Sequence, residues 1–134
     1  MYVRRPTLHW HQQPPREDRR LDAEARAHAV IDVLSDLQAQ DIALLDIRKS
    51  ASFADFFVIG TAGNPRQLQA FVDRIDEALG KSGVHERHRE GKAESGWVLM
   101  DYDDVIVHLF SPQLHAYYRL EELWAPGASV VHFT

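Results

Sequence analysis

Three acidic side chains lie close together in the last third of the chain. Asp101, Asp103 and Asp104 fall within four residues. Carboxylates at such spacing can hold Mg²⁺ for phosphoryl or nucleotidyl transfer. That chemistry also needs a phosphate cradle, and the nearest candidate, Gly-Thr-Ala-Gly-Asn at 60–64, carries no following lysine. The pattern therefore favours a turn with solvated acids, and a magnesium-dependent nucleotidyltransferase-like enzyme stays as the alternative.

Histidines are the other candidates for site chemistry. One pair lies within the first 11 residues, and His85 and His88 form another. Two ligands do not make a zinc site, and the chain has no cysteine. His108 and His115 titrate near neutral pH, but neither has an evident nucleophile beside it, and no Gly-x-Ser-x-Gly elbow is present. We therefore predict no catalytic residue, no bound metal and no cofactor.

Length and composition favour one globular domain. The chain has 134 residues, of which 45% are hydrophobic and 26% are charged. This length is enough to form a hydrophobic core without disulfide or metal cross-links. The absence of cysteine excludes disulfides, and no apolar run is long enough to span a membrane or to form a secretory signal. A cytoplasmic protein that does not enter membranes is the expectation.

Charge is distributed unevenly along the chain. Residues 1–20 hold five arginines and two acids, a net +3, and the other 114 residues hold 10 basic and 18 acidic side chains, a net −8. An acidic body does not favour sequence-specific nucleic-acid binding but suits a basic protein partner. We expect a basic, flexible N-terminal arm at 1–20, a folded domain at 21–126 and a C-terminal tail at 127–134.

The elements that position these residues follow from apolar periodicity. A first helix is expected from Asp22, its N-cap, to near Gln40. A second begins at Asn64 with Pro65 at its first position and Gln67 completing a capping box. The order predicts an α/β domain with a mixed five-stranded sheet and flanking helices. The expected strands cover 42–47, 56–60, 84–88, 97–102 and 104–110, and a third helical stretch covers 112–124.

The hairpin at 97–110 is the most informative segment. Side chains alternate across a strand, so a loop with an even number of residues assigns each residue to one face. Face one is almost wholly apolar and is expected under the helices, whereas face two mixes large apolar groups with carboxylates and an imidazole. Face one holds Val98, Met100, Tyr102, Val105, Val107 and Leu109; face two holds Trp97, Leu99, Asp101, Asp104, Ile106, His108 and Phe110.

Two explanations of face two remain open. Another helix can cover it, leaving the polar groups at the edge. Alternatively, it is partly open and docks a partner, since exposed aromatic groups ringed by charge match an interface anchor with a polar rim. If that partner is a second copy of the chain, the protein is a dimeric scaffold.

Several motifs together resemble the ribosomal silencing factor family, RsfS or Iojap. They occur in the family's order and spacing across about residues 21–126. The family's usual Thr-Gly-x-Ser is Thr-Ala-Gly-Asn here, Asp103 replaces a turn glycine, and an ion pair from a family arginine near His115 is expected to be missing. The motifs are 54–61 (ADFFVIGT), Arg66 with its helix, Glu90-Gly91, 96–102 (GWVLMDY), 104–110 (DVIVHLF) and 118–124 (YRLEELW).

The resemblance implies a nucleotidyltransferase-like fold without established transferase activity. It implies binding to the large ribosomal subunit at its fourteenth protein, a steric block of joining with the small subunit, and repression of translation when nutrients are scarce. It also implies a homodimer when the protein is free. Trp97 is the expected anchor, and acidic groups are expected to meet basic groups of the partner. The predicted partner-binding residues are Trp97, Leu99, Asp101, Tyr102, Asp104 and His108.

Overall fold

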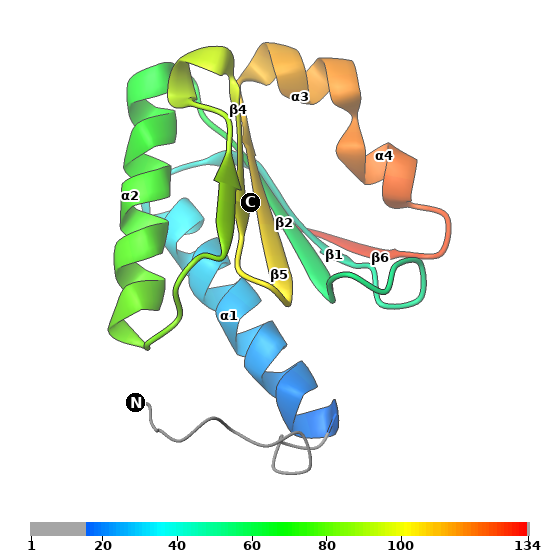
Figure 1. Ribbon diagram of the computed structural model, residues 1–134. Helices are drawn as coiled ribbons and strands as arrows, with labels where there is room; N and C mark the ends of the chain where they lie inside the picture. The colour runs from blue at the N-terminus through cyan, green and yellow to red at the C-terminus, as the bar shows by residue number, and fades with distance from the viewer. Residues whose placement is uncertain (1–15, 134) are drawn as a thin grey trace.

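Three layers make up the fold (Figure 1). A computed structural model describes residues 16–133. Helices α1 and α2 cover one face of a central sheet, and the short helices α3 and α4 lie on the other face. In chain order the elements are α1 (Arg16–Asp36), β1 (Gln40–Asp46), β2 (Phe56–Thr61), α2 (Pro65–Lys81), β3 (His88–Glu90), η2 (Ala93–Ser95), β4 (Trp97–Asp101), β5 (Val105–Phe110), α3 (Pro112–Tyr118), α4 (Leu120–Trp124) and β6 (Ser129–Phe133).

The sheet is mixed, as the sequence predicts, but it has six strands rather than five. Their order is β3-β4-β5-β2-β1-β6, and only β2 and β5 pair in parallel. The sixth strand comes from the expected tail, where Ser129–Phe133 pairs antiparallel with β1. The prediction missed β6 because its pairing depends on the free edge of β1, which local sequence does not reveal.

Helix α1 begins earlier than predicted. It starts at Arg16, so Asp22 lies inside the helix and is not its N-cap. Residues 16–22 lack an apolar stripe but contain helix-favouring Arg, Glu and Leu, with no Pro or Gly to interrupt them. The helical backbone of 16–20 therefore departs from the expected flexible arm, and the rest of that arm, residues 1–15, lies outside the described residues. No helix in the described part is long and apolar enough to cross a membrane.

The start of α2 matches its prediction. The Asn64 side chain accepts a hydrogen bond from the Gln67 backbone N–H at 2.8 Å, and Pro65 occupies the first turn. The return bond of the predicted capping box is shifted by one residue, because the Gln67 side chain accepts the backbone N–H of Gly63 at 2.6 Å and not that of Asn64. The helix buries the expected apolar stripe against the sheet, namely Leu68, Phe71, Val72, Ile75 and Leu79.

The β4–β5 hairpin has the even loop on which the face assignment depends. Tyr102 donates its backbone N–H to the carbonyl of Val105, which leaves a two-residue loop. The strands pair in register from Trp97 opposite Phe110 to Asp101 opposite Ile106. Face one is confirmed as core, because all six of its residues are buried in the cluster beneath α1 and α2.

The expected third helix is broken at Arg119. This residue has a φ of 48°, ends α3 and precedes α4. Ser111 caps α3 by accepting the Leu114 backbone N–H at 3.2 Å. The left-handed residue turns the chain, so that α4 follows a new direction across β1.

The backbone of Asp103, in the hairpin loop, is strained. Asp103 has a φ of 77°, a region that suits glycine, and an exposed ion pair with Arg87 compensates little. We expect Asp103→Gly to raise the free energy of unfolding by about 0.5 kcal/mol, because relief of left-handed strain exceeds the added unfolded-state entropy. Urea denaturation checks this. A less stable variant would contradict the strain argument.

Candidate partner-binding face

Face two of the sheet is partly covered and partly open. Helix α4, the segment after it and the loop before β2 cover its β1–β2 side, forming a second core around Leu45, Phe57 and Ile59. On the β4 side Trp97 and Leu99 are only half-buried. Both explanations offered from the sequence therefore apply, each to a different part of this face. We call Trp97, Leu99 and Asp101 the open edge.

A continuous run of aromatic rings crosses this face, which we call the aromatic belt. Each ring lies within 6.2 Å, centroid to centroid, of the next. Its two ends are the most exposed, with Phe53 54% and Tyr117 76% accessible. Phe57 and His108 in its middle are 4% and 5% exposed, so the belt joins a buried aromatic core to exposed rings, which can anchor a partner. The belt comprises Phe53, Trp124, Phe57, His108, Trp97, Tyr118 and Tyr117.

Trp97 joins the belt to the open edge. Its ring packs 4.7 Å from Tyr118 and 5.0 Å from Phe110, centroid to centroid. Its Nε1–H donates to His108 Nδ1 at 3.2 Å. These contacts hold a large half-exposed ring in one orientation, which is the arrangement of an interface anchor.

Asp101 is held inside its own hairpin. Its carboxylate accepts the Asp103 backbone N–H at 2.7 Å and pairs with Arg87 at 3.1 Å. The side chain is 14% exposed, whereas Arg87 is 63% exposed. A basic partner group would therefore compete with Arg87 for this carboxylate.

Three of the predicted partner-binding residues do not present an accessible side chain on face two. Tyr102 is 2% exposed on face one, and burial raises the pKa of its phenol, which donates to Asp76 at 3.2 Å. His108 is on face two, as a member of the belt, but is only 5% exposed. Asp104 departs from the face that parity gave it, because the loop turns its carboxylate toward α1 and Arg26, 3.2 Å away. Of the predicted set, Trp97, Leu99 and Asp101 are the residues partly exposed on face two.

The acidic residues considered for magnesium do not point to one place. Asp101 and Asp103 both pair with Arg87 at the β3–β4 edge, and Asp104 pairs with Arg26 of α1. Within residues 16–133, no group of three or more histidines and carboxylates is arranged to hold a metal ion. The geometry therefore gives the transferase alternative no specific support.

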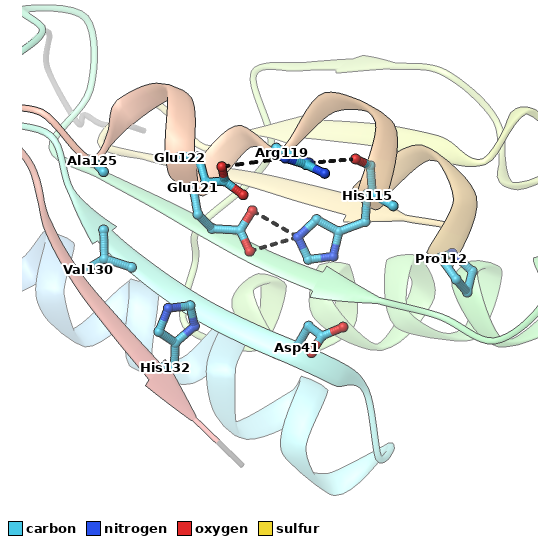
Figure 2. A pocket seen from close by; sticks show the side chains of 10 residues that line it. Asp41, Pro112, His115, Arg119, Glu121, Glu122, Ala125, Val130 and His132 are labelled. Carbon is cyan, nitrogen blue, oxygen red and sulfur yellow. Dashed lines mark hydrogen bonds and ion pairs between the residues drawn. The ribbon is translucent and has the colours of Figure 1, made fainter.

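A pocket of about 680 Å³ opens between α3, α4 and the β1–β6 side of the sheet (Figure 2). His115 lies within it, with Nε2 2.7 Å from the Glu121 carboxylate and Nδ1 2.7 Å from the Thr61 hydroxyl. Figure 2 shows Asp41 and His132 on the strand side, below this pair. The network ties β2, α3 and α4 together and supplies an ion pair where the sequence led us to expect one to be missing.

The His115–Glu121 pair has a defined electrostatic effect. The hydrogen bond to Glu121, opposed by burial, raises the pKa of His115 from its usual 6.5. Burial alone would raise the pKa of Glu121. The hydrogen bond from His115 outweighs this effect, so the pKa lies below its usual 4.5. The His115 contribution to stability is complete below pH 6.5 and the Glu121 contribution above pH 4.5, so the pair stabilises most between those values.

We expect Glu121→Gln to lower the free energy of unfolding by about 1 kcal/mol near pH 5.5, because a half-buried pair is lost. The deficit should shrink as the pH rises above 6.5 and His115 loses its proton, and as it falls below 4.5 and Glu121 gains one. Denaturant titrations across pH measure it. The matched control is Glu122→Gln, whose exposed carboxylate lies 3.8 Å from Arg119 and should show no such window. Equal pH profiles for the two variants would contradict the assignment.

Sequence reasoning missed most of the belt and the whole pocket network. Trp124 and Tyr118 were seen only as members of a helical stretch and a family-like motif. Their density within 117–124 was the available signal, but their exposure depends on the break at Arg119. The link from Thr61 to His115 spans 54 residues and has no local signature.

Fold and surface together define the class: a three-layer α/β protein with a mixed six-stranded sheet and one partly open aromatic face. The family model described as ribosomal silencing factor during starvation, RsfS, matches residues 20–132, and the chain belongs to this family. The ribosomal silencing factor RsfS of Zymomonas mobilis is 32% identical over 114 residues, covering 85% of this chain and 86% of the relative.

Two further similarities extend across kingdoms and to solved structures. The chloroplastic protein Iojap of Zea mays is 32% identical over 111 residues, which are 81% of this chain and 48% of that protein. A crystal structure of a protein from Chromobacterium violaceum superimposes with a TM-score of 0.72 at 33% identity, covering 76% of this chain and 85% of the other. The likeness to the silencing factor family inferred from the motifs is thereby confirmed.

Proposed function

We propose that this protein binds the large ribosomal subunit at its fourteenth protein and sterically blocks joining with the small subunit. The open edge and the adjoining aromatic belt make the contact. Repression of translation in the cytoplasm under nutrient limitation is the consequence, and no catalysis is involved. Membership in the ribosomal silencing factor family supports the ribosome as partner.

The single observation that carries the choice of surface is the half-exposed Trp97 at the junction of belt and open edge. A large aromatic group held by neighbours and bordered by polar groups is the usual centre of binding energy in an interface. Residues 21–134 carry a net charge of −8, which favours encounter with a basic ribosomal protein. The Trp97 anchor and the negative charge are thus both suited to a basic ribosomal protein as the partner.

Co-sedimentation tests the proposal. Purified protein is centrifuged with isolated large subunits, isolated small subunits and joined ribosomes, at low and moderate salt. The expected result is co-migration with large subunits alone, since the joined ribosome hides the surface. Absence of binding at both salt concentrations, or preference for small subunits, would contradict it.

We also propose that the free protein is a homodimer. The exposed rings of the belt, Phe53, Tyr117 and Tyr118, are costly in water, and pairing of two copies would cover part of them. Sedimentation equilibrium should give a mass near twice the 15.4 kDa of one chain. A single species of one-chain mass at micromolar concentration would exclude the dimer without affecting the ribosome proposal.

A further inference from the structure

His108 is a polar residue in an otherwise apolar position. It lies in the centre of β5 and is 5% exposed, and the residues before and after it on the same face are Ile106 and Phe110. Its ring packs edge-on against Phe57 with centroids 4.8 Å apart and lies parallel to Phe110 at 6.2 Å. An aliphatic side chain of similar size would satisfy these packing contacts, so packing does not explain the imidazole.

Within the described part of the chain, this imidazole makes a hydrogen bond to Trp97 alone. The indole Nε1–H donates to His108 Nδ1 at 3.2 Å, so Nδ1 carries no proton and Nε2 carries it. Burial lowers the pKa of His108 to about 4, which keeps the ring neutral and Nδ1 available as an acceptor at neutral pH.

The other nitrogen is buried without a partner. His108 Nε2 is shielded from solvent, and no hydrogen-bonding group of the described residues reaches it. A buried donor without an acceptor destabilises a fold, and natural proteins contain few of them. The imidazole therefore carries a cost in stability that a leucine would avoid.

The effect of this arrangement is on the orientation of the Trp97 indole. The rings of Phe110 and Tyr118 restrict where the indole lies, but ring contacts do not decide which edge faces the sheet. The hydrogen bond to Nδ1 decides it, because only one indole orientation directs Nε1–H at the acceptor. Trp97 is half-buried, so part of the oriented indole remains accessible for docking.

We propose that His108 is a positioning residue that fixes the Trp97 indole for docking, at the expense of a buried unpaired nitrogen. The proposal rests on the proposed function, in which Trp97 is the anchor. It predicts that stability and partner binding respond in opposite ways when the imidazole is replaced. A residue with a purely structural role would lose both together.

The test compares His108→Leu with His108→Asn. Leucine removes the acceptor and the unpaired donor, whereas the asparagine side-chain oxygen can replace Nδ1 as the acceptor. His108→Leu is expected to melt at a temperature equal to or above that of the parent. It should bind isolated large subunits about threefold to tenfold more weakly, which is the effect of one hydrogen bond. His108→Asn should recover most of the binding, and Ile106→Val on the same strand should leave binding unchanged.

A spectroscopic measurement distinguishes failure of this proposal from failure of the proposed function. The Trp97 indole N–H signal, assigned by its loss in Trp97→Phe, should shift markedly in His108→Leu and return toward the parent position in His108→Asn. An unchanged signal, or binding that falls only in step with melting temperature, would overturn the positioning role. If the parent does not bind large subunits, the proposed function fails, and the indole signal still decides whether His108 orients Trp97.

Discussion

Trp97→Ala should weaken binding to the large ribosomal subunit by a factor of about 30 to 1000, equivalent to roughly 2–4 kcal/mol. The substitution removes the ring that joins the belt to the open edge, together with its contacts to Tyr118 and Phe110. It also leaves His108 without its hydrogen-bond donor. Titration of large subunits with labelled protein measures the change in dissociation constant.

The matched control for this prediction lies on the far side of the sheet. Asp73 is exposed on α2, and Asp73→Ala should bind as the parent does. A melting curve of Trp97→Ala shows whether the variant is folded at the assay temperature. A folded Trp97→Ala protein that binds as tightly as the parent would remove Trp97 from the role of anchor.

Gly91→Ala should reduce the free energy of unfolding by about 3 kcal/mol or more, since severe overpacking adds to left-handed strain. Gly91 has a φ of 84°, and a Cβ there would lie 2.0 Å from the backbone oxygen of Trp97. That oxygen belongs to the sheet and cannot rotate away as a side chain could. The start of β4 would have to move, so binding to large subunits should weaken as well.

Gly83→Ala separates the two causes of this loss. Gly83 has a similar φ of 78°, but a Cβ there would meet nothing within 4 Å. It should lose only about 1–2 kcal/mol from backbone strain and should keep its affinity for the ribosome. Equal losses in urea denaturation for the two variants would mean that the contact with Trp97 is relieved at little cost.

The two faces of the β4–β5 hairpin could be predicted because strand parity is a local rule. Once the loop has two residues, Val98, Met100 and Val107 must share one face. The cap of α2 could be predicted for the same reason, because Asn64 and Gln67 act within one turn. Local geometry thus accounts for most of the elements and for the core under the long helices.

The features that could not be predicted from the sequence depend on contacts between distant segments. Strand β6 exists because β1 offers it an edge, and α3 and α4 are separate helices because the chain turns at Arg119. The burial of two predicted partner-binding residues also depends on distant segments, and the set as a whole stays a prediction. Tyr102 is buried on face one, where its hydroxyl donates to Asp76 of α2, and His108 is buried on face two.

Site-specific photocrosslinking tests most directly whether the open edge is the ribosome-binding surface. A photoreactive amino acid replaces Leu99, half-exposed on the open edge, and in a second protein it replaces Asp73 on α2. After irradiation with large subunits, the Leu99 probe should be joined mainly to the fourteenth protein of that subunit, and the Asp73 probe should not. A crosslink from Asp73 but not from Leu99 to that protein, or a Leu99 crosslink to another site only, would contradict the proposal.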